Sequence, residues 1–108
     1  MDTKYVLICT IVNAGYGNGM MLAARQAGAT GGTLLKARGT GTEEDVKFFG
    51  ITLMPEKEMV LIVAERSGAD ELMEVLGTVS LLSEPGSGIV FSIPVEDLIT
   101  LGKKAANA

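Results

Sequence analysis

Two short glycine-rich segments carry the residue types that could bind an anion. Both have a Gly-x-Gly spacing, with Thr40 between the glycines at 39–41 and Ser87 between those at 86–88. We call them the first and second glycine clips. Glycines let successive backbone N–H groups converge on one anion, and the hydroxyls would add donors. Arg38 precedes the first clip, where its forked guanidinium could bind a phosphate. Ordinary turn geometry is the alternative for either clip alone.

A third glycine cluster, at 15–19, does not fit a dinucleotide-binding fingerprint. It follows an apolar stretch and precedes a helical pattern, but Met20 occupies the place of the third glycine. About 20 residues further on, where the fingerprint needs an acidic residue for the ribose, the chain has Lys36 and Arg38. The cluster therefore predicts a flexible turn into a helix.

The chain has few residues that could catalyse a reaction. It contains no His and one Cys, Cys9, within an apolar run. This composition excludes zinc fingers, catalytic triads with His and disulfide frameworks, and we expect no bound metal. An enzyme would have to use Glu43, Glu44 or Asp45 as a base, although three adjacent carboxylates are typical of a solvated loop.

Length and composition limit the function further. The 108 residues are enough for one domain, and the net charge of −4 argues against a nucleic-acid partner. The longest apolar stretches, at 5–12 and 59–64, are shorter than a membrane span, so we expect a cytoplasmic protein with no membrane insertion. The hydrophobic fraction of 47% indicates that some apolar surface lies between subunits.

Runs of β-branched and apolar residues predict four main strands, at 4–13, 33–38, 59–66 and 89–93. Residues 48–54 should also be extended, and Pro55 should begin a turn that ends at Glu58. The first and third main strands are apolar at nearly every position. They should therefore be buried on both faces.

Two segments have the apolar periodicity of helices. Asn18 can cap the first, and Gly28 should end it. Ser67 and Asp70 have capping-box spacing ahead of the second, which should run to about Leu82.

The resulting order, βαββαβ with an extended hairpin in the middle, predicts an α+β ferredoxin-like sandwich. Two helices would cover one face of an antiparallel sheet. The other face is apolar as well, so oligomerisation should cover it. In such an oligomer the two glycine clips could meet across a cleft between subunits.

Three segments, at 28–41, 58–65 and 86–93, carry a family resemblance. They look like the second strand, the third strand and the nucleotide-binding loop of nitrogen regulatory P-II proteins, and the similarity extends over about residues 4 to 101. The resemblance implies a homotrimer whose intersubunit clefts bind an adenine nucleotide (ADP, AMP or ATP) as an effector. It also implies a mobile T-loop that docks onto a regulated partner, such as a membrane transport protein.

The resemblance implies two sets of functional residues. The T-loop would span about 39–54, and residues 102–108 would form a flexible tail. Ile11, Thr33 and Ile62 would border the adenine. The nucleotide-binding set is Ile11, Thr33, Arg38, Gly39, Thr40, Gly41, Ile62, Gly86, Ser87 and Gly88, and the partner-binding loop comprises Thr42, Glu43, Glu44, Asp45, Phe48 and Phe49.

Several positions depart from the family's usual pattern. Ile89 replaces a phosphate-binding Lys, and Thr100 and Gly102 replace two Arg. Thr42 or a neighbour replaces the Gln that holds Mg²⁺ and 2-oxoglutarate, and Glu56 replaces the Lys that pairs with the oxoacid. Because cations bind phosphates through charge-assisted hydrogen bonds, their loss predicts a preference for fewer phosphates or for binding without Mg²⁺.

The T-loop between Gly41 and Ile51 is also several residues shorter than usual and contains no Tyr, so we do not expect uridylylation. Together these observations predict a divergent P-II-like regulator. A trimeric assembly protein that binds no nucleotide is the alternative, and a small enzyme has less support.

Overall fold

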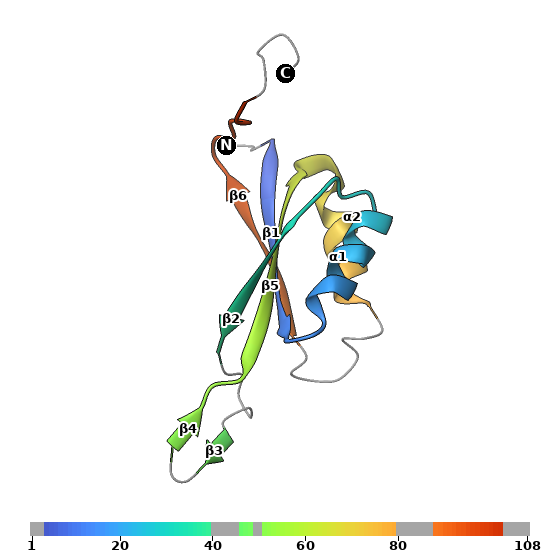
Figure 1. Cartoon of the computed structure of the whole chain (residues 1–108). Helices are drawn as coiled ribbons and strands as arrows, with labels where there is room; N and C mark the ends of the chain where they lie inside the picture. Colours follow the sequence, from blue (N-terminus) through green and yellow to red (C-terminus); the bar gives the residue numbers. More distant parts are fainter. Residues whose placement is uncertain (1–3, 40–45, 49–50, 80–87, 103–108) are drawn as a thin grey trace.

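The computed structural model describes residues 4–39, 46–48, 51–79 and 88–102. The elements among these residues are β1 (Tyr5–Asn13), α1 (Gly17–Gln26), β2 (Thr33–Arg38), β3 (Val46–Phe48), β4 (Ile51–Leu53), β5 (Glu56–Glu65), α2 (Arg66–Gly77) and β6 (Gly88–Val95) (Figure 1).

The main sheet has the strand order β2-β5-β1-β6, and every neighbouring pair is antiparallel. Both helices lie on the same side of this sheet (Figure 1). The predicted ferredoxin-like sandwich is therefore confirmed. The short strands β3 and β4 pair separately as a hairpin, which extends past the end of the sheet (Figure 1). Neither α1 nor α2, the helices of the described part of the chain, is long and apolar enough to cross a membrane.

The hydrophobic core lies between the sheet and the two helices. Alternate residues of the two central strands face it, since side chains of a strand point to opposite faces in turn. Ile8 and Ile62 are register partners at its centre, exposed by 0% and 1%. The buried core cluster comprises Val6, Ile8, Val12, Met20, Ala24, Val60, Ile62, Ala69, Leu72 and Leu76.

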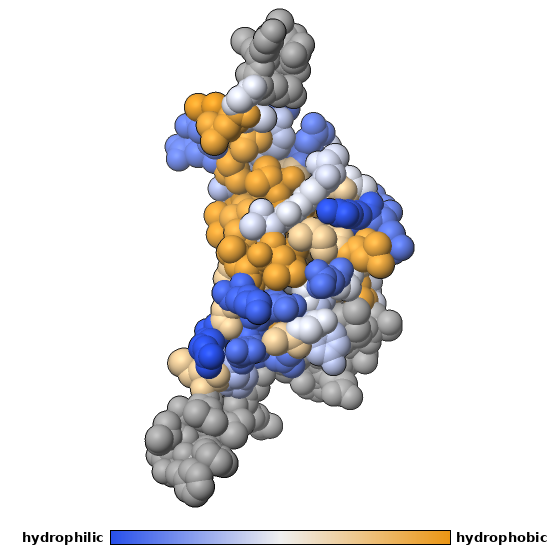
Figure 2. Space-filling view, in the orientation of Figure 1, coloured by the Kyte–Doolittle hydropathy of each residue, from blue (hydrophilic) through white to orange (hydrophobic). Residues whose placement is uncertain are grey.

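The face of the sheet that carries no helix is apolar too. At its centre Cys9 is only 4% exposed, between its register partners Leu61 on β5 and Phe91 on β6. Around it, large hydrophobic side chains are exposed, from 36% for Phe91 to 58% for Ile89. Figure 2 shows hydrophobic residues gathered over this part of the molecule, with a hydrophilic belt on the side of the hairpin. The prediction that the first and third main strands are buried on both faces is therefore confirmed only in part: their helix-free face is apolar, but Val63 on β5 is 45% exposed there in the protomer.

The helix ends differ in part from the prediction. The N-cap of α1 is Tyr16, not Asn18, which already lies inside the helix. Gly28 does end that segment, with a φ of +108° that favours glycine. Glu65 is the N-cap of α2 and its side chain makes no capping hydrogen bond, so the predicted capping box is wrong. This helix ends at Gly77, where Thr78 hydrogen-bonds back to the carbonyls of Glu74 and Val75, and Leu82 lies outside the described residues.

The predicted turn from Pro55 to Glu58 is wrong. Strand β5 begins at Glu56, because this segment pairs with β2 on one side and with the end of β1 on the other. Two strand partners outweigh the turn preference that Pro55 and the three charged residues indicate. The last strand is also longer than predicted and includes Pro94, which is tolerated because β6 is an edge strand.

Candidate functional site at the base of the hairpin

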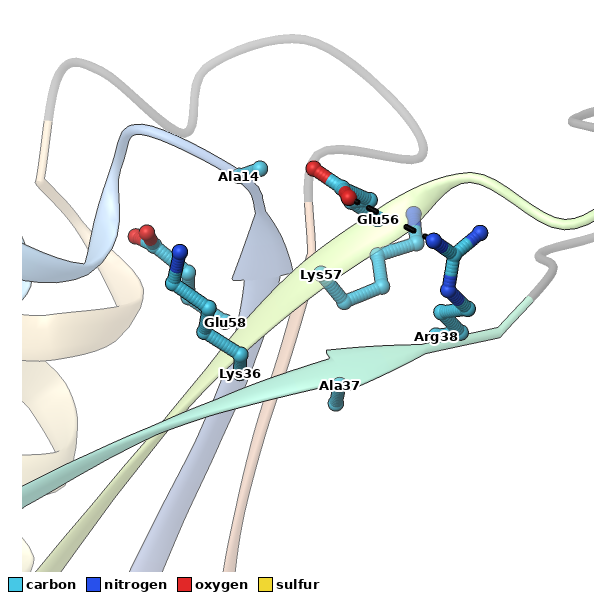
Figure 3. A pocket seen from close by; sticks show the side chains of 7 residues that line it. All are labelled: Ala14, Lys36, Ala37, Arg38, Glu56, Lys57 and Glu58. Carbon is cyan, nitrogen blue, oxygen red and sulfur yellow. Dashed lines mark hydrogen bonds and ion pairs between the residues drawn. The ribbon is translucent and has the colours of Figure 1, made fainter.

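Charged side chains gather where β2 and β5 leave the sheet toward the hairpin. The register places Lys36 opposite Glu58 and Arg38 opposite Glu56. Together with Lys57, these residues line a cavity of about 350 Å³, which Ala14 and Ala37 complete (Figure 3). Three cations and two carboxylates therefore share one small opening.

Arg38 and Glu56 form an ion pair across the two strands. The guanidinium Nη2 lies 3.5 Å from the carboxylate Oε1 (Figure 3). Both side chains are largely exposed, by 66% and 70%, so water screens their attraction. Such a pair contributes about 0–1 kcal/mol to stability and breaks easily. One residue further along, the N–H of Gly39 donates to the carbonyl of Pro55 at 3.2 Å and closes the base of the hairpin.

The Glu58 carboxylate has a different role. Its Oε1 accepts a hydrogen bond from the backbone N–H of Gly17 at 2.7 Å. A carboxylate at this place stabilises the positive end of the helix dipole, and the first turn of α1 contains no acidic residue of its own. The third glycine cluster was predicted to form a flexible turn, but only Gly15 lies in a turn, whereas Gly17 and Gly19 belong to α1. The chain's own Glu58 carboxylate occupies this helix start.

The side chain of Lys57 lies on the helix-free face at this end of the sheet, opposite to the face of Glu56 and Glu58. It is only 9% exposed, and its Nζ donates to Oδ1 of Asn13 at 2.6 Å. The register pairs the same two residues directly. The sequence alone assigned no role to Lys57 or Glu58, because it predicted a turn at 55–58, and none to Asn13, the last residue of the first predicted strand. The signal for them was the alternation of charge in Glu56-Lys57-Glu58, which suits a strand with two different faces.

The structure separates the residues expected around the adenine. Ile11 and Thr33 lie on the helix-free face, since their register partners there include Met59 and Leu61. Ile62 faces the helices and belongs to the buried core. One protomer therefore does not bring these three side chains together.

The described ends of the two glycine clips lie at the same end of the sheet but on opposite edges. Gly39 follows β2 at one edge, and Gly88 begins β6 at the other, packed against the backbone of Ile11 and Val12. Three strand spacings separate those edges, which is roughly 14 Å. The remaining residues of the clips, and most of the predicted partner-binding loop, lie outside the described residues: Thr40, Gly41, Thr42, Glu43, Glu44, Asp45, Phe49, Gly86 and Ser87.

Other predicted positions are placed only in part. The backbone of Phe48 belongs to β3. Ile89, at the position of a family Lys, is 58% exposed on the helix-free face. Thr100 and Gly102 follow the end of β6, which is at the end of the sheet away from the hairpin. They therefore lie at the opposite end of the sheet from the charged cavity. Among the described residues, no group of three or more His, Cys, Asp or Glu could hold a metal ion.

A second cavity, of about 460 Å³, lies at the opposite end of the sheet, near the N-terminus of α2. Small and apolar residues form most of its lining, and Glu65 is the charged residue among those described there. This cavity offers no cation to an anionic ligand. The cavity at the hairpin base is therefore the better candidate site.

Comparison with known proteins agrees with this architecture. The sequence model of the family "Nitrogen regulatory protein P-II" matches residues 6–104. The fold is similar to the crystal structure of Arabidopsis thaliana PII bound to citrate, with a TM-score of 0.71 and 22% sequence identity over 93% of this chain and 85% of that one. No curated protein sequence matches the chain significantly.

Proposed function

The chain belongs to the nitrogen regulatory protein P-II family, and from this premise we propose that it is a homotrimeric regulator that binds an adenine nucleotide between subunits. Proteins of this family are regulatory and act on target proteins. We further propose that residues 1–108 form one P-II-like domain in the cytoplasm. Residues 39–54 would be its T-loop, which acts on a membrane transport protein or another regulated target, and residues 102–108 its tail.

One observation carries the nucleotide proposal: Gly39 and Gly88, the described ends of the two glycine clips, lie at the same end of the sheet, on opposite edges. A single protomer holds them apart, so a cleft that contains both needs the edge β2 of one copy beside the edge β6 of another. The exposed apolar face of the sheet supports the same assembly, because monomeric proteins rarely leave such a patch uncovered.

In this cleft Arg38 would bind phosphate oxygens, and the N–H groups of the clips would bind them as well. Ile11 and Thr33 would contact the adenine base from the helix-free face. Ile62 would not contact the base directly but would stabilise the same part of the sheet by packing in the core. A nucleotide held at Gly39 would order the base of the T-loop and so change the conformations available to its tip. Partner binding would then depend on occupancy through a population shift.

A trimeric assembly protein with an empty cleft is the second candidate. The observation that favours it is that the chain's own groups occupy the charged cavity: Arg38 pairs with Glu56, and Glu58 binds Gly17. This candidate makes a clear prediction, namely that no nucleotide stabilises the protein.

Thermal unfolding tests both candidates. The full chain would be melted with ATP, ADP, AMP, cyclic nucleotides, 2-oxoglutarate and citrate, each with and without Mg²⁺, while light scattering records the mass. Citrate is included because it is the ligand of the Arabidopsis PII structure. A trimer stabilised by an adenine nucleotide supports the regulator, and stabilisation grows with ligand concentration as RT ln(1 + [L]/Kd). A trimer that no nucleotide stabilises supports the assembly protein, and a monomer contradicts both.

A further inference from the structure

The five charged groups of the cavity at the hairpin base are not equally able to receive a ligand. Glu58 is held by the N–H of Gly17 at 2.7 Å, and Lys57 is held by Asn13 at 2.6 Å with its side chain buried. Arg38 is instead held by an exposed carboxylate at 3.5 Å, the outer limit of a hydrogen bond. Of Arg38 and Lys57, Arg38 is therefore the cation that an incoming anion can take over at the lower cost. The third cation of the cavity, Lys36, lies opposite Glu58, two residues further from the hairpin.

We propose that Glu56 determines how many phosphates the proposed nucleotide cleft prefers in its ligand. Glu56 would hold Arg38 when the cleft is empty and would compete with the ligand's phosphates for Arg38. The proposal rests on the proposed function and adds a specificity-determining residue to it. Glu56 and Arg38 are cross-strand neighbours at the last pair of β2, so their side chains meet without any change of backbone.

Two physical effects make Glu56 selective. The first is competition, because a phosphate that binds the Nη2 group of Arg38 must share or replace the contact with the Glu56 carboxylate. Phosphate is a strong bidentate partner for a guanidinium. The second is repulsion, because the displaced carboxylate stays on the wall of the same cavity of about 350 Å³, beside the bound anion. Repulsion grows with the negative charge of the ligand, so Glu56 disfavours additional phosphates more than the first. The uncharged nucleoside is unaffected.

The test is calorimetric titration of the full chain with adenosine, AMP and ADP in the absence of Mg²⁺. We expect Glu56→Gln to bind ADP about two- to fivefold more tightly than the unchanged protein, the range that an exposed ion pair allows. The gain should be smaller for AMP and absent for adenosine. Glu56→Asp keeps the carboxylate and should return the ADP affinity toward that of the unchanged protein.

Two further variants separate competition from a general change of charge. In the Arg38→Gln background, Glu56→Gln should lose most of its gain for ADP, because the residue it competes for is gone. Glu71→Gln removes the same charge from an exposed position on α2 and should leave all three affinities unchanged.

The outcomes are distinguishable. An unchanged or weaker affinity of Glu56→Gln for ADP overturns the proposal, and so does an equal gain for adenosine or in Glu71→Gln. If neither the unchanged protein nor any variant binds any of the three compounds, the proposed function itself is wrong and the role of Glu56 falls with it. Melting temperatures of the variants identify any loss of fold. We expect none, because the side chains of Arg38 and Glu56 are 66% and 70% exposed.

Discussion

The carboxylate of Glu58 on β5 accepts a hydrogen bond from the backbone N–H of Gly17, 41 residues earlier in the chain, at 2.7 Å. The contact ties the start of α1 to the sheet beside the hairpin base. A Cβ at position 17 would lie 2.6 Å from Glu58 Oε1 and 2.7 Å from Leu34 Cδ1, so both side-chain ends would have to move if Gly17 were replaced.

Gly17→Ala should therefore lower the free energy of unfolding by about 1 kcal/mol, because the Glu58 carboxylate must move away and weaken its hydrogen bond with the Gly17 N–H. Gly68→Ala is the matched control, because a Cβ at Gly68 in α2 meets no atom within 4 Å. That change should raise the free energy of unfolding by about 0.5–1 kcal/mol, since alanine favours a helix. Urea denaturation at one protein concentration measures both, and equal effects of the two substitutions would contradict the close contact.

Thr10 has a fully buried hydroxyl that finds no hydrogen-bond partner among the described residues. Thr10→Val keeps the side-chain shape and removes the unsatisfied group, so we expect it to raise the free energy of unfolding by about 1 kcal/mol. The control is Thr78→Val, because the Thr78 hydroxyl donates to the carbonyl of Glu74 at 2.9 Å. Thermal unfolding should show stabilisation by the first change and none by the second. A destabilised Thr10→Val would show that the hydroxyl has a partner after all.

Assembly through the helix-free face can be tested by charge insertion. Ile93 on β6 is 47% exposed on that face, and Leu22 on α1 is 58% exposed on the helix side. Ile93→Glu should dissociate the proposed trimer, because a carboxylate would be buried without a partner at the proposed interface. Leu22→Glu introduces the same charge and should leave the mass unchanged. Sedimentation at micromolar concentration decides, and a stable oligomer of Ile93→Glu would place the interface elsewhere.

Burial of the Cys9 thiol makes the stability of the fold depend on pH. Desolvation by burial raises the pKa of its thiol above the ordinary value of 9.0. In the unfolded chain the thiol therefore ionises at a lower pH than in the folded protein. Burial of the neutral thiol contributes fully to stability below pH 9, and this contribution is lost as the pH rises further. We expect Cys9→Ser, which does not ionise there, to show a flatter fall in stability above pH 9. We also expect thiol reagents to modify Cys9 slowly in the folded protein and quickly in urea, as absorbance assays would show.

Much of the architecture followed from local patterns. The bounds of β2 agree with the prediction, and β1 differs by one residue, because apolar runs of β-branched residues between glycine-rich turns leave few alternatives. The central hairpin and the order of helices and strands then permit few connections, and the sandwich follows from them. The turn at 55–58 and the two helix caps were predicted wrongly, since each depends on a partner distant in sequence.

Some residues of the candidate site were likewise predicted from the sequence, and others were missed. Arg38 and the two glycine clips were predicted from residue type and spacing, and the structure places Arg38 in the charged cavity. Glu56 was noted only as a replacement for a Lys, and the roles of Glu58, Lys57 and Asn13 were missed. All four act through cross-strand or strand-to-helix contacts that no local pattern encodes.

The sequence by itself determined which residues are apolar, which can form strands or helices, and where glycine permits the backbone to approach an anion. Only the tertiary structure decided which charges face one another. A strand's alternation gives each residue a face, but the register with its neighbours selects the opposing residue, and here it sets Arg38 against Glu56 and Lys57 against Asn13. Because the energy of a charged group depends on the partners within a few ångströms, its chemistry was fixed at that step and no earlier.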